Sequence, residues 1–140
     1  MTTPAIPHFC TINDFLSAIR SRHRTRNDGL FCLRLEDTFP HTTDVMPPFR
    51  KDFYFLSLIT DPGPTQIGYD DRAAHNLTAF LVFQSPGHVY SWRRDRTPKG
   101  YLVYFRRACF DFFRPDFDAE FSFFNPLHTN FFRLLPEHFT

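Results

Sequence analysis

Hydrophobic residues along this chain fall in short runs that Gly, Pro and Asp separate. The main runs, rich in aromatic and β-branched residues, cover residues 30–36, 52–60, 78–84, 100–105 and 128–134. Two shorter runs flank an Asp70-Asp71 turn. Short strands at regular spacing with turn residues between them are typical of an antiparallel barrel or jelly roll, not of a parallel sheet. The pattern therefore predicts an all-β fold.

A Pro-Gly pair stands at the centre of the most regular part of the pattern, residues 78–105. Pro86 fixes φ at the first corner of a turn, and Gly87 tolerates positive φ at the second. We therefore expect the chain to reverse direction within two residues, between a strand over 78–84 and a strand over 88–92.

Two short helices are expected besides the strands. Thr11 followed by Asp14 resembles a capping box, and the apolar residues after it recur at helical intervals, which predicts a short amphipathic helix from about residue 12 to 20. A second short helix is expected near 107–113. Residues 1–9 form an arm that is either disordered or laid over the domain.

Composition agrees with a β-rich protein. The chain has 20 Phe and 12 Pro in 140 residues, and its formal charge of +1 gives no global field that would attract a polyanion such as DNA. Cys10, Cys32 and Cys109 are odd in number and far apart, so we expect buried thiols in a reducing compartment. No apolar run has the length of a membrane span, which favours a cytoplasmic protein without a membrane partner.

Three segments in order, residues 48–55, 85–92 and 100–105, together resemble the N-terminal sensor domain of AraC-family transcription regulators, and residues 123–134 resemble a segment that follows in one group of that family. The resemblance implies a cupin-like jelly-roll barrel over 30–135. Residues 1–29 would be the arm and short helix, and 136–140 the start of a truncated C-terminal helix. It also implies a bacterial, cytoplasmic, non-catalytic domain that binds a small-molecule effector, in a regulator that forms a homodimer and contacts DNA through a helix-turn-helix domain absent here.

Metal-binding cupins place His and Glu ligands at fixed motif positions. The matching positions here are Phe49, Lys51, Phe55 and Tyr90, so the resemblance implies no metal ion, no other cofactor and no catalytic residues. The alternative is a standalone cupin enzyme such as a sugar isomerase or epimerase, or a dioxygenase. A metal-free epimerase needs a His base beside a carboxylate, and the motifs place no such pair.

Strand alternation gathers the candidate binding residues on two facing strands. The candidates are Phe49, Lys51, Phe53 and Phe55 on one strand face, and Tyr90 with Trp92 on the other. If these faces look inward, they form an aromatic pocket with one ammonium group, suited to a sugar-like or aromatic effector. The other interpretation is that the rings fill the core while Lys51 reaches the rim. The sequence leaves both open.

Overall fold

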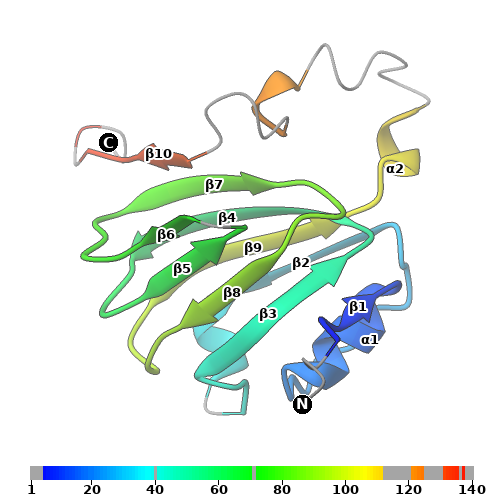
Figure 1. Ribbon diagram of the computed structural model, residues 1–140, viewed down its shortest axis with the longest axis horizontal. Helices are drawn as coiled ribbons and strands as arrows, with labels where there is room; N and C mark the ends of the chain where they lie inside the picture. The colour runs from blue at the N-terminus through cyan, green and yellow to red at the C-terminus, as the bar shows by residue number, and fades with distance from the viewer. Residues whose placement is uncertain are drawn as a thin grey trace.

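Two mostly antiparallel β-sheets lie face to face in this protein (Figure 1). The computed structural model describes residues 5–39, 41–70, 72–111, 121–124, 131–135 and 137. Each sheet has five strands, in the orders β1-β3-β8-β5-β6 and β10-β7-β4-β9-β2. The elements are β1 (His8–Phe9), α1 (Ile12–Ala18), β2 (Leu30–Arg34), η1 (Leu35–Thr38), β3 (Val45–Lys51), β4 (Tyr54–Asp61), β5 (Gln66–Tyr69), β6 (Arg72–Ala74), β7 (Phe80–Gln84), β8 (Tyr90–Arg93), β9 (Lys99–Phe105), α2 (Ala108–Asp111), η2 (Ser122–Phe124) and β10 (Phe131–Arg133). The predicted all-β fold is confirmed.

Helix α1 confirms the N-terminal helix prediction. The Asp14 amide donates to Thr11 Oγ1 over 3.0 Å, which caps the first turn. Its apolar face is buried, and the Phe15 ring lies 5.3 Å from that of Phe49 on β3 and 5.7 Å from that of Tyr104 on β9. Helix α1 therefore covers the side of the structure where the edges of the two sheets come together (Figure 1). Helix α2 lies within the predicted 107–113, of which 112 and 113 are outside the described residues.

The Pro-Gly turn forms, but the two strands that flank it do not pair with each other. Strand β7 pairs with β4 and β10, whereas β8 pairs with β3 and β5 in the other sheet. Gly87 has φ 85°, as the turn requires, and its amide donates to the Lys51 carbonyl over 3.1 Å. The turn is specified by its own residues, but strand partners are chosen by contacts distant in sequence. It therefore carries the chain from one sheet to the other.

Strand β3 contains two prolines and has an irregular pairing. It includes Pro47 and Pro48, and its pairing with β8 shifts register between Met46 and Phe49. Proline cannot donate a ladder hydrogen bond, so it fits a strand at such an irregularity. On its other side β3 pairs in parallel with β1, where the Arg50 amide donates to the Pro7 carbonyl over 2.8 Å. The described part of the N-terminal arm is thus laid over the domain.

The prediction of buried thiols is wrong for Cys10 and Cys32, which are exposed, and Cys109 is half-buried. On β2 the inward positions are taken by Phe31 and Leu33, so strand alternation turns Cys32 to solvent.

Several predictions are only partly covered by the described residues. Strand β10 falls inside the predicted strand over 128–134, while 112–120, 125–130 and most of 136–140, including the expected C-terminal helix, lie outside the description. Among the described strands, every ladder stays within one sheet, so hydrogen bonding does not close them into a barrel. None of the helices in the described part of the chain is long and apolar enough to cross a membrane.

Candidate functional site

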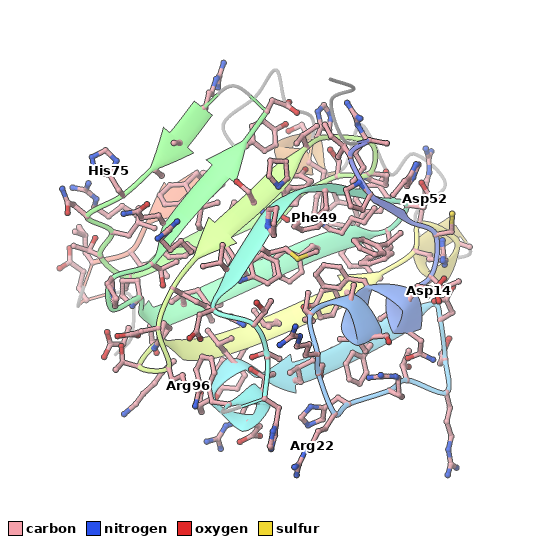
Figure 2. All side chains as sticks on the ribbon, turned by 60° about the horizontal axis from the view of Figure 1, so that its bottom comes forward. Asp14, Arg22, Phe49, Asp52, His75 and Arg96 are labelled. Carbon is pink, nitrogen blue, oxygen red and sulfur yellow. The ribbon has the colours of Figure 1, made fainter. Side chains whose placement is uncertain are left out.

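A cavity of about 90 Å³ lies between the two sheets. Strands from both sheets, α1 and η1 contribute to its wall. Figure 2 shows Phe49 pointing from β3 into this interior, with α1 below it. The wall is mainly apolar and aromatic, with a few polar side chains, the composition typical of a small-molecule site. The polar or charged residues in it are Ser21, Thr38, Thr42, Lys51, Ser57, Thr65, Gln84, Ser91 and Arg94.

Most of the predicted site residues do come together at this cavity. Those that line it are Phe49, Lys51, Phe55, Tyr90 and Trp92. Phe53 does not line it. Phe53 occupies the bend between β3 and β4, is fully buried, and packs at 5.8 Å and 5.9 Å from the rings of Phe15 and Tyr104. Phe53 keeps the inward phase of Phe49 and Lys51, but it lies at the bend where the chain passes to the other sheet, so its ring packs in the core beside the cavity wall.

Lys51 is the chemically unusual group of the cavity. Its side chain is inward because it alternates with Phe49 on β3, and only 1% of the residue is exposed, so it does not reach the rim. Its ammonium donates to Gln84 Oε1 over 2.8 Å and lies 3.9 Å from the centroid of the Tyr90 ring. The described residues place no carboxylate within ion-pair distance of it. Burial therefore lowers the pKa of Lys51 well below its ordinary value.

The turn holds Tyr90 in place. Its hydroxyl donates to the Ser85 carbonyl over 2.9 Å and accepts from the Ser85 amide over 3.1 Å. Burial raises the pKa of Tyr90, so the phenol stays neutral. Because its hydroxyl is fully engaged, Tyr90 offers the cavity the face of its ring, and that face is already turned to Lys51.

Arg94, which the sequence reasoning missed, forms the second cationic part of the wall. Its guanidinium carbon lies 5.3 Å from the Trp92 ring and 5.2 Å from the Phe39 ring, and Nη2 donates to Thr42 Oγ1 over 3.2 Å. Burial lowers the pKa of Arg94, although a guanidinium stays charged. Arg94 Nε and Trp92 Nε1 are buried donors without a hydrogen-bond partner among the described residues.

Gln84 was missed as well, although the sequence pattern points to both Gln84 and Arg94. Gln84 alternates with Phe80 and Val82 on β7, and Arg94 continues the alternation of Tyr90 and Trp92. A polar residue in phase with buried positions is the sign that it faces the interior.

Acidic side chains are not part of the described cavity wall, and the described residues contain no cluster of three or more His, Cys, Asp or Glu that could hold a metal ion. His88 does not line the cavity; it is half-buried, and its Nδ1 lies 3.1 Å from Asp70 Oδ2. The cavity thus offers donors and rings, and its only ionisable groups besides tyrosines are cations.

Comparisons with known proteins give no identification. The chain matches no family model and no curated protein.

Proposed function

We propose that this chain is a small-molecule-binding domain whose ligand enters the cavity between the sheets. The observation that carries the proposal is the Lys51 ammonium, which faces the cavity with one hydrogen bond, to Gln84. An ammonium has three donors, and an unsatisfied buried donor costs about 1–3 kcal/mol. A ligand with an acceptor group would satisfy the remaining ones. If Lys51 only filled the core, an apolar side chain in its place would avoid the free-energy cost of burying a charge.

We further propose that ligand binding is regulatory, as in the sensor domains of AraC-type regulators. Support comes from the ordered sequence segments and from two facing sheets, the arrangement that a cupin-like jelly roll requires. Helix α1 lines the cavity through Phe15 and Leu16, and its C-cap residue Ile19 does so too. Strand β1 pairs with β3 at Lys51 itself. A ligand that alters the packing of Phe15 would shift the N-terminal segment, and an output domain could read that shift as a change between two states.

The binding proposal is tested by filling the cavity. Ser57 lies on β4, is buried and lines the cavity, so Ser57→Leu should block every ligand. Thr60→Leu on the same strand is exposed and serves as the matched control. We expect a calorimetric screen of sugars and aromatic acids to find compounds that bind the wild type and Thr60→Leu but not Ser57→Leu. Binding that survives Ser57→Leu, or no binding at all, would refute the proposal.

The regulatory proposal is tested at the gene. We expect the reading frame after codon 140 to encode about 120 to 150 further residues, the size of an ordinary domain, with two helix-turn-helix patterns. A stop codon there would instead favour a standalone binding or enzymatic domain.

A further inference from the structure

We propose that the ligand is a small organic carboxylate whose acid group is bound by Arg94 and Trp92, with an apolar body no larger than one ring. This inference rests on the proposed cavity function and adds the chemical class of the ligand. It starts from two buried N–H groups, Arg94 Nε and Trp92 Nε1, that have no acceptor among the described residues.

Both donors belong to residues of the cavity wall, and the two side chains lie against each other. The Arg94 guanidinium carbon lies 5.3 Å from the Trp92 ring, and Arg94 also contacts the Thr42 hydroxyl. A buried donor without an acceptor is rare in native proteins because it loses its hydrogen bond to water. A carboxylate has two acceptor oxygens and can take one hydrogen bond from a guanidinium and another from an indole.

The charge of the wall favours an anion over a neutral acceptor. Lys51 and Arg94 are cations, and the described wall contains no Asp or Glu. Asp44 is the acid whose charge acts on Arg94, and its buried Oδ1 also has no hydrogen-bond partner among the described residues. It makes no ion pair with Arg94 and lies outside the wall. The two cations flank β8 in the cavity wall, since Lys51 contacts Tyr90 at the start of the strand and Arg94 follows its last residue.

The size of the cavity limits the body of the ligand. A cavity of about 150 Å³ holds benzene in a well-studied case, whereas this one is about 90 Å³. A short branched chain fits without change. A single aromatic ring fits only if a side chain such as Phe15 moves, and two fused rings do not fit.

Benzoate and its neutral isostere benzamide are the probes. Trp92 is the only tryptophan of the chain, so its fluorescence reports binding directly at the site. We expect the wild type to bind benzoate at least about tenfold more tightly than benzamide, as hydrogen bonds to a charged group imply, and not to bind 2-naphthoate. Arg94→Met should abolish the preference, and Arg94→Lys should keep part of it. Arg96→Met, an exposed arginine of the same loop (Figure 2), should change nothing.

Two further variants keep the test decisive if Arg94→Met does not fold. Trp92→Phe retains an aromatic ring but removes the N–H, and calorimetry should show about tenfold weaker benzoate binding with benzamide less affected. Asp44→Asn removes the carboxylate whose negative charge interacts with Arg94 and would repel a bound acid. This variant should bind benzoate several-fold more tightly.

The outcomes separate the two proposals. Equal affinity for benzoate and benzamide, with both lost in Ser57→Leu, would overturn the carboxylate inference and leave cavity binding intact. A benzoate preference that survives in Arg94→Met would also overturn the inference. Binding of no compound in the wider screen would overturn the proposed function itself.

Discussion

The two faces of the β10-β7-β4-β9-β2 sheet carry different aromatic clusters. The inner face joins the core and the cavity, where rings surround Lys51, Gln84 and Arg94. The outer cluster consists of Tyr54, Phe83, Val103, Phe105, Phe121 and Phe124. There the rings of Tyr54 and Phe105 stack at 5.2 Å, with Phe124 edge-on to Tyr54 at 5.1 Å. Figure 1 shows η2, which contains Phe124, above this outer face.

The contrast teaches how to recognise a site among many phenylalanines. Strands β4, β7 and β9 supply alternate residues to both clusters, so the two share one backbone and one composition bias. The described members of the outer cluster are aromatic or apolar, which packing alone explains. The inner cluster contains buried cations, which reduce stability unless a partner compensates for them. Four predictions test this contrast.

The largest effect is expected from truncating the inner cluster. Phe49 is 1% exposed and contacts rings from α1, β1 and β8, so Phe49→Ala should lower the free energy of unfolding by about 3–5 kcal/mol. Phe124→Ala should cost less, about 2 kcal/mol, because it removes burial without enlarging the cavity. Urea unfolding measures both. A larger loss in Phe124→Ala would show that the outer cluster is the main core.

The next effect concerns the polar pair inside the inner cluster. Replacing both partners, Lys51→Met with Gln84→Leu, should raise the free energy of unfolding by about 1–3 kcal/mol, since a buried amine is exchanged for packed apolar atoms. Lys51→Met alone should gain less, because it leaves the Gln84 carbonyl without a donor. Destabilisation of the double variant would mean that the pair serves folding and not a ligand.

A pH titration of stability examines the same amine. The pKa of Lys51 is lowered by burial, so between that value and the ordinary 10.5 the unfolded chain holds a proton that the folded chain does not. Stability therefore rises with pH in this window, by at most about 1.4 kcal/mol per pH unit, and this group adds no pH dependence below the folded pKa or above 10.5. We expect the difference between wild type and Lys51→Met to follow this course in denaturant unfolding at several pH values. A constant difference would contradict it.

The smallest change in stability is expected for an ion pair outside both clusters, and it gives a reference for the larger changes. His8 on β1 lies 2.5 Å from Asp52, and this bond is the main reason why the pKa of Asp52 is lowered. Both side chains are largely exposed, so His8→Ala should cost less than about 1 kcal/mol. A lowered carboxyl pKa stabilises above the ordinary value of 3.8 and ceases to do so as pH falls through the lowered one. Thermal melts of both proteins should therefore begin to converge as pH falls below 3.8, and coincide only below the lowered pKa of Asp52.

Local patterns predicted the elements of the fold better than their partners. The strand runs, the Thr11 cap and the turn at Gly87 are set by neighbouring residues, and the structure confirms them. The sheet to which β8 belongs depends on contacts with β3 and β5, which periodicity does not encode.

The same limit applies to the site. Alternation placed Phe49, Lys51, Tyr90 and Trp92 on inward faces, and they do line one cavity. Alternation also turned Phe53 inward, and it is buried in the core, but at the bend between the two sheets it packs beside the cavity and does not line it. Whether a cavity remains depends on how rings such as Phe15 and Tyr104 pack together, and a single sequence does not specify that packing.

The parallel pairing of β1 with β3 has a consequence for how copies of this chain meet. Without β1, one side of β3 would present free amides and carbonyls, a template on which another extended chain can add. With β1 in place, the amides of Arg50 and Asp52 donate hydrogen bonds to the carbonyls of Pro7 and Phe9, respectively. The N-terminal segment thus covers the edge of β3 and prevents edge-to-edge association. Any event that detaches it uncovers a strand edge, next to the cavity wall, on which another chain can pair.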